Sequence, residues 1–208
     1  MDFHIVTTLF DLQTCSGISK DKVLSAEEKW GHLPDVLKDF YIQLGAETNV
    51  CYICDELLQP RELYEKDGHL CFYKAAQGAL AWYIKLTDLD KIDPPVVCRN
   101  TFDQSFLPAC DTLSHFLCAV SCMQGINEGL PFTSEGFYPA NEQLIQQIKG
   151  TLGKKEFYMD NAPRIDFYSL HDDDILAIVS NNRVVQIGYA SSNEEHFEEM
   201  DSLVSQFL

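Results

Sequence analysis

Positive charge is scarce in this sequence. Its 208 residues include 15 Lys and Arg against 32 Asp and Glu, which gives a net charge of −17. Proteins that bind nucleic acid or anionic membranes directly need clusters of cationic side chains, because phosphate groups repel an acidic surface. The composition therefore argues against nucleic acid and against membrane as partners, and it favours a basic protein. The alternative is that the acidity serves only to keep the protein soluble.

Long apolar runs are also missing. A helix that spans a bilayer needs roughly 20 apolar residues in succession, and no segment approaches that length. The N-terminus carries Asp2 and has no Lys or Arg ahead of its short apolar run, so it lacks the pattern of a secretory signal peptide. We therefore expect a cytoplasmic protein. A chain of this length can bury roughly 70% of its unfolded surface, which is ample for one hydrophobic core.

The sequence contains none of the motifs that mark common catalytic and cofactor sites. It has no glycine-rich phosphate loop, metalloprotease helix, nucleophile elbow or catalytic Cys signature. The six His are scattered, and none lies at ligand spacing from another. His115 flanks the apolar face of an expected helix, where a helix residue with satisfied hydrogen bonds is a commoner role than a catalytic base. We expect no enzymatic activity and no cofactor.

Eight Cys in a chain that lacks a secretory signal should be reduced thiols. The spacing of Cys51 and Cys54 is typical of half a zinc site. The other half could come from Cys118 and Cys122, or from His69 and Cys71. However, Cys51-Tyr-Ile-Cys54 lacks the Gly that usually shapes a metal-binding turn. We expect buried free thiols and no metal, with structural zinc and a redox-active pair as the alternatives.

The clearest structural pattern lies in residues 70–97. Two strand-like runs flank the turn signal Gln77-Gly78, and the second run alternates in polarity with period two. This alternation predicts a β-hairpin with one buried face, on which Trp82 is the largest core side chain. Asp93-Pro94-Pro95 follows, where the proline rings fix the backbone and predict a rigid turn.

Weaker patterns predict the remaining elements. Helices are expected over 19–30, 34–44, 110–124, 140–149 and from 192 onward, and strands over 3–9, 50–53, 96–100, 156–159, 164–170, 174–179 and 184–190. Together they predict an α+β fold with a largely antiparallel sheet flanked by helices. Residues 125–139 are rich in Gly, Pro and Ser, so we expect them to connect a core of residues 1–124 to a hairpin and helix extension of residues 140–208 on the same core.

Acidic residues concentrate toward the C-terminus. Residues 151–208 hold 11 Asp and Glu against 4 Lys and Arg, a net charge of −7, which leaves −10 for the much longer part before them. One cluster lies at an expected hairpin turn and the other on one face of the last helix. Their members are Asp172, Asp173 and Asp174, and Glu194, Glu195, Glu198 and Glu199. A solvated turn and a solvated helix face are the ordinary interpretations.

Several motifs, taken in order, resemble the SUKH superfamily over about residues 20–122. A helix entered through Leu33-Pro34 contains Phe40, and L-x-F-Y-x-x-x-Q-G follows at 70–78, ending at Gln77 and Gly78. The series then continues with W-x-I at 82–84, which begins with Trp82, and with D-P-P-V at 93–96, which begins with Asp93 and Pro94. The superfamily is best known for bacterial toxin-immunity proteins and also includes a fungal cell-wall regulator.

This resemblance implies a SUKH-like α+β fold and an immunity protein that holds a cognate toxin, often a nuclease, inactive. None of the signature residues is catalytic in that family. Nuclease toxins are basic because they bind phosphates, so the two acidic clusters become the candidate contacts with the partner. The alternative is a regulatory or scaffold module of the same fold with no toxin partner.

Overall fold

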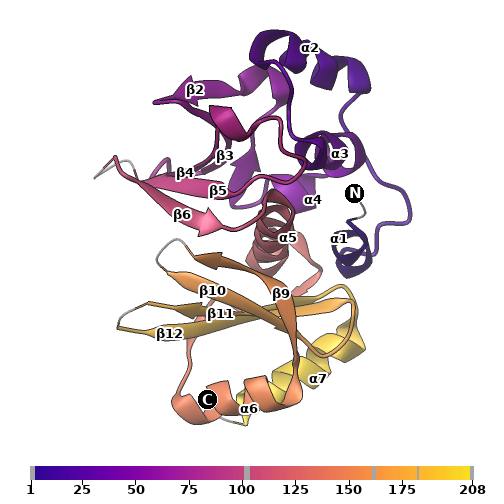
Figure 1. Cartoon of the computed structure of the whole chain (residues 1–208). Helices are drawn as coiled ribbons and strands as arrows, with labels where there is room; N and C mark the ends of the chain where they lie inside the picture. The colour runs from indigo at the N-terminus through magenta and orange to yellow at the C-terminus, as the bar shows by residue number, and fades with distance from the viewer. Residues whose placement is uncertain (1–2, 101–103, 161–162, 182, 207–208) are drawn as a thin grey trace.

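The computed structural model describes residues 3–100, 104–160, 163–181 and 183–206. It has an α+β fold with two antiparallel β-sheets (Figure 1), where the sequence had predicted one largely antiparallel sheet. The N-terminal sheet has the order β1 (Asp55–Leu57), β3 (His69–Ala75), β4 (Leu80–Lys85), β5 (Val96–Asn100) and β6 (Phe106–Cys110), and β2 (Tyr64–Lys66) also pairs with β3. The C-terminal sheet has the order β7 (Phe132–Thr133), β12 (Val185–Ser191), β11 (Asp174–Ser180), β10 (Arg164–Ser169) and β9 (Gly153–Asp160), and β8 (Tyr138–Pro139) also pairs with β12.

The α-helices described are α1 (His4–Leu9), α2 (Lys20–Trp30), α3 (Asp35–Leu44), α4 (Thr48–Cys51), α5 (Leu113–Gln124), α6 (Glu142–Thr151) and α7 (Glu194–Ser205). Two single 3₁₀ turns, η1 (Pro60–Glu62) and η2 (Leu86–Asp88), and a π-type turn, η3 (Gly125–Gly129), complete the order. None of the helices in the described part of the chain is both long enough and apolar enough to cross a bilayer.

Helix α5 lies between the two sheets (Figure 1). Residues on all of its sides are buried, as expected of a helix enclosed within a core. Toward the N-terminal sheet, the Phe116 ring lies 5.5 to 5.7 Å from the rings of Phe72, Tyr73 and Trp82. Toward the C-terminal sheet, α5 contacts β9, whose Phe157 belongs to the same core. The two sheets therefore share one hydrophobic core through α5.

A second core fills the other face of the C-terminal sheet. Helices α6 and α7 lie against this face (Figure 1), and their buried residues pack on the outward side chains of β10, β11 and β12. Leu144 and Ile148 come from α6, and Met200 and Val204 come from α7. Apolar residues three and four positions apart on each helix produce these contacts. Both faces of the C-terminal sheet are thus covered.

The predicted hairpin forms as β3 and β4, with Gly78 at a positive φ of 66° in its turn. Trp82 is 3% exposed, as predicted, and its ring contacts Tyr73 and Phe116. The prediction of a single buried face is wrong, because Tyr83 on the opposite face is only 4% exposed. On that face the side chains of Tyr64 from β2 and Phe106 from β6, two other strands of the same sheet, meet the Tyr83 ring edge to face.

Two strands that the sequence predicted are helices. Instead of the strand predicted at 3–9, α1 (His4–Leu9) follows its N-cap Phe3, because Phe3, Val6 and Leu9 recur at helical spacing and are buried in the core. Residues 50–53 contain the end of α4. The sequence patterns also missed β6. The helix predicted from 192 onward is α7, which begins at Glu194 after its Asn193 cap, and residues 207–208 of that prediction lie outside the described residues.

Candidate partner-binding surface

The fold brings the two acidic clusters together. The β10–β11 turn lies against the first turns of α7, and two histidines join them. His171 Nε2 is 2.9 Å from Glu199 Oε2, and His196 Nδ1 is 2.6 Å from Asp173 Oδ1. The two imidazole rings stack on each other with centroids 3.8 Å apart and an interplanar angle of 20°. The turn therefore supplies His171 and Asp173, and α7 supplies His196 and Glu199, to one group of four contacting side chains.

Backbone contacts fix the start of α7 beside this turn. The Asp173 carbonyl oxygen accepts hydrogen bonds from Ser191 Oγ at 2.9 Å and from the Ser192 N–H at 3.0 Å. The Asn193 side chain accepts from the N–H groups of Glu195 and His196, which caps the helix. Acidic residues in the first helical turn are stabilised by the positive end of the helix dipole. The acids of α7 are thus held in a fixed position relative to the turn.

Asp174 does not belong to this surface, so the prediction that it is an exposed partner contact is wrong. Its side chain is buried, and the residue is 1% exposed. Oδ1 accepts from the Leu170 N–H at 2.8 Å and Oδ2 from the His171 N–H at 2.9 Å. Burial raises the pKa of Asp174 above its usual value, and the two backbone donors oppose that rise. Asp174 therefore has a structural role, which is to close the β10–β11 turn.

The remaining acids form what we call the acidic surface. It consists of Asp172, Asp173, Glu194, Glu195, Glu198 and Glu199, of which all but the half-buried Asp173 are exposed. The hydrogen bond with Glu199 is the main cause that raises the pKa of His171, and the negative charges of Asp174 and Asp173 add to it. Such a surface can pair with Lys and Arg side chains of another protein.

The predicted signature residues lie elsewhere and support the fold. Asp93 accepts hydrogen bonds from the Ser114 N–H at 2.8 Å and from Ser114 Oγ at 2.6 Å, so it fastens the β4–β5 connection to the first turn of α5. Pro94 beside it is buried. Because α5 is the helix that both sheets share, this pair of hydrogen bonds fixes the element at the centre of the molecule.

The other signature residues also have structural positions. Pro34 is buried and directly precedes α3, and Phe40 packs inside that helix against the ring of Phe3 at 4.9 Å. Gln77 and Gly78 lie exposed in the β3–β4 turn. Trp82 lies in the shared core. None of these side chains approaches the acidic surface.

The cysteines are placed as single thiols. Cys51 is buried and its Sγ donates to the Leu44 carbonyl at 3.4 Å, while Cys54 contacts the Gln124 side chain. Burial raises the pKa of Cys54 to about 12, and it also raises that of Cys118 to about 12. Zinc binds thiolates, so these environments do not suit it. Within the described ranges, no group of three or more His, Cys, Asp and Glu is arranged to hold a metal ion.

Sequence reasoning missed the two histidines at the centre of the site. His171 and His196 are 25 positions apart, and neither has another His at ligand spacing. The available signal was that each His lies inside one of the acidic clusters, directly before Asp172 and directly after Glu195. A search for imidazoles embedded in acidic segments would have selected both.

No family model, no curated protein and no solved structure matches this chain.

Proposed function

We propose that this protein is a non-catalytic binding protein of the toxin-immunity type, which holds a basic protein partner through its acidic surface. The observation that carries the proposal is the meeting of the two acidic clusters around the stacked His171–His196 pair. Charges that are separated in sequence act here as one patch. The α7 cap and the β10–β11 turn hold that patch in place before any partner arrives.

The physics of association supports this function. A patch of one sign steers an oppositely charged protein toward it, and such steering raises association rates by roughly 10 to 10³. It acts through solvent, so it weakens as salt screens the charges over a Debye length of about 10 Å at 0.1 M. A basic toxin that binds nucleic acid presents the cationic groove that such a patch would occupy.

The resemblance to the SUKH superfamily points the same way. Its signature residues in this chain lie in the core, at the entry to α3, in the β3–β4 turn and in the β4–β5 connection, which leaves the surface free to vary with the partner. The charge argument and the resemblance rest on different parts of the chain. The resemblance covers residues within 20–122, while the acidic surface lies beyond residue 170.

The test is neutralisation of the protein encoded by the adjacent gene. That protein is produced in a host cell with and without this chain, and growth is followed together with complex formation between the purified proteins. We expect growth to be rescued and a stable complex to form. If neither neighbouring gene product is toxic or binds this chain, the immunity function is wrong and the regulatory or scaffold alternative takes its place.

A further inference from the structure

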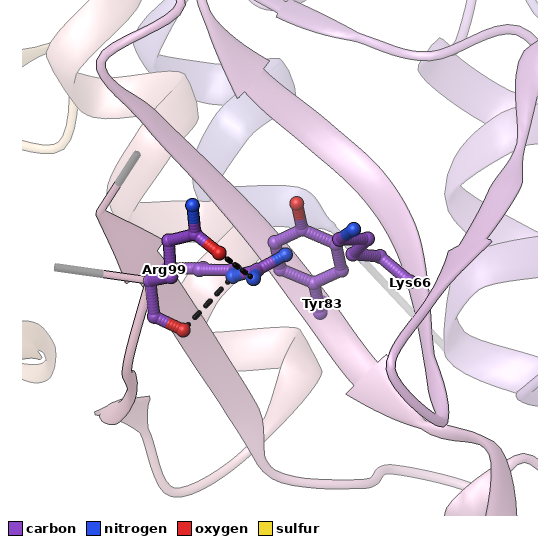
Figure 2. A pocket seen from close by; sticks show the side chains of 4 residues that line it. Lys66, Tyr83 and Arg99 are labelled. Atoms are coloured by element: carbon purple, nitrogen blue, oxygen red, sulfur yellow. Dashed lines mark hydrogen bonds between the residues drawn. The ribbon is translucent and has the colours of Figure 1, made fainter. Parts of the chain in front are cut away.

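A second site lies on the outer face of the N-terminal sheet, far from the acidic surface. Figure 1 shows β2 at the upper left, β6 at mid-height on the left and α7 at the lower right of the molecule. Between β2, β4 and the start of β6 lies a pocket of about 250 Å³, lined by Lys66, Tyr83, Arg99 and Gln104. Figure 2 shows Lys66 and Arg99 on either side of the Tyr83 ring. Two of the few cations of an acidic chain thus converge on one cavity.

Arg99 is held rigidly in this pocket. It is 9% exposed, and its guanidinium donates through Nε to the Gln104 carbonyl at 3.0 Å and through Nη2 to Gln104 Oε1 at 3.2 Å. Nη2 also pairs with Asp67 Oδ2 at 3.1 Å. The guanidinium carbon lies 5.2 Å from the centre of the Phe106 ring. A buried charged side chain in a fixed orientation is the usual recognition element of an anion site.

Aromatic rings form the floor of the pocket and its surroundings. Phe106 stacks on the His69 ring at 3.9 Å and meets Tyr83 edge to face at 5.2 Å. Tyr64 lies 6.5 Å from Tyr83 on the side of β2. Burial raises the pKa of Tyr83, whose hydroxyl interacts with the side chains of Tyr64 and Cys71. The pocket therefore combines a flat apolar floor with cationic walls, which is the pattern of small-ligand sites.

The charges select the class of anion. Asp67 is paired with Arg99, so Lys66, Arg99 and Asp67 together leave a single positive charge beside the cavity. The pocket volume of about 250 Å³ lies just below the usual range of ligand pockets, so a small molecule suits it. We propose that this pocket binds a small organic monocarboxylate whose flat apolar part lies on Tyr83 and whose carboxylate lies between Lys66 and Arg99. This site is independent of the proposed immunity function.

The probe is benzoate, which carries one carboxylate on a flat ring. Its binding to the full chain is followed by backbone amide NMR, with neutral benzamide and inorganic phosphate as comparison ligands at the same ionic strength. We expect saturable shifts at Lys66, Tyr83 and Arg99 with benzoate and about tenfold weaker binding of benzamide, because benzamide lacks the charge. Equal binding of benzoate and benzamide, or tighter binding of phosphate, would overturn the monocarboxylate assignment.

A matched pair of variants locates the site. Lys66→Ala removes an exposed cation that lines the pocket. Lys85→Ala removes an exposed cation at the end of β4 that is not among the lining residues. We expect Lys66→Ala to weaken benzoate binding about fivefold to tenfold and Lys85→Ala to leave it within about twofold, because only the first removes a contact. Arg99→Lys keeps the charge but loses the planar fork, and it should also weaken binding. Equal effects of the two Lys variants would overturn the site.

Discussion

The two sheets share helix α5 but differ in how their outer faces are covered. Helices α6 and α7 cover the C-terminal sheet and enclose a second core between themselves and the strands. On the outer face of the N-terminal sheet, aromatic side chains of the sheet's own strands pack against one another instead, and this face carries the pocket of Lys66 and Arg99. The acidic surface and the cationic pocket therefore belong to different sheets.

This difference shows that charged and core-forming side chains lie on opposite sides of α7 but side by side on the outer face of the N-terminal sheet. An amphipathic helix laid on a sheet buries one side and presents the other to water, so α7 can carry Glu195 and Glu198 without disturbing the core. A sheet face with no helix on it in the described part of the chain has to bury polar and aromatic groups together. Arg99 is consequently tied by hydrogen bonds to Gln104 and paired with Asp67. We expect substitutions on the exposed side of α7 to leave stability nearly unchanged. Substitutions of the buried groups on the outer face of the N-terminal sheet should lower it.

The largest effect is expected at the core that both sheets share. Replacing Trp82 by Ala removes a ring that contacts Tyr73 and Phe116 and leaves a cavity. The free energy of unfolding should fall by about 3–5 kcal/mol, measured by urea denaturation. Leu107→Ala in the same sheet is the control, because Leu107 is 45% exposed and its loss should change stability by about 0.5 kcal/mol or less. Similar losses for the two variants would contradict this account of the core.

A smaller loss of stability is expected when Asp174 is replaced, and almost none when the exposed Asp172 is replaced. Asp174→Ala leaves the part-buried N–H groups of Leu170 and His171 without the acceptor that a buried carboxylate gave them, which should cost about 1–3 kcal/mol of unfolding free energy. Asp172→Ala removes an exposed carboxylate two positions earlier and should stay within about 0.5 kcal/mol. If the two alanine variants unfold at the same urea concentration, Asp174 does not close the turn.

The pH dependence of the His171–Glu199 pair should be smaller still. The folded-state pKa of His171 is raised, so its contribution to stability is fully present below its unfolded value of about 6.5 and is lost as the pH rises through the folded pKa. Because the pair is partly exposed, the contribution should be at most about 1 kcal/mol. His171 faces Glu199, Asp173 and Asp174 as well as the ring of His196.

Glu199→Gln tests this assignment. Glu199 is the main cause of the shift, so the NMR titration of His171 in the variant should move to lower pH. Glu194→Gln, on the same helix but without a contact to His171 in the described structure, is the matched control and should move it less. A titration of His171 that is the same in both variants would show that Glu199 does not hold the imidazolium.

The sequence predicted those elements whose pattern is local. The β3–β4 hairpin, α3 and the four strands β9 to β12 of the C-terminal sheet follow from alternation, helical spacing and turn residues within each segment, whereas the short strands β7 and β8 lie where a connecting segment was predicted. Residues 50–53 were mistaken for a strand because their composition is strand-like, whereas Val50 and Cys51 end α4 and a residue distant in sequence binds the segment that follows. Gln124 of α5 accepts hydrogen bonds from the N–H groups of Ile53 and Cys54 at 3.0 and 2.8 Å.

The candidate sites show the same limit. The acidic clusters are visible as runs in the sequence, but their meeting depends on contacts between His171 and Glu199 and between His196 and Asp173, which only the folded chain specifies. The pocket was not predicted at all. Lys66, Tyr83 and Arg99 come from three different strands and form no motif along the chain. Local patterns therefore located the charges, and tertiary packing assembled the sites.

The most direct test of the central claim is the rate at which this protein associates with its proposed partner, a basic protein encoded by a neighbouring gene. Stopped-flow measurements at low and physiological salt would compare the double variant Glu195→Gln, Glu198→Gln with Asp21→Asn, Glu28→Gln, which removes two exposed charges from α2. We expect the α7 variant to associate about threefold more slowly at low salt and with a flatter salt dependence, while the α2 variant keeps the wild-type rate. Equal rates for the two variants at low salt would contradict the role of the acidic surface.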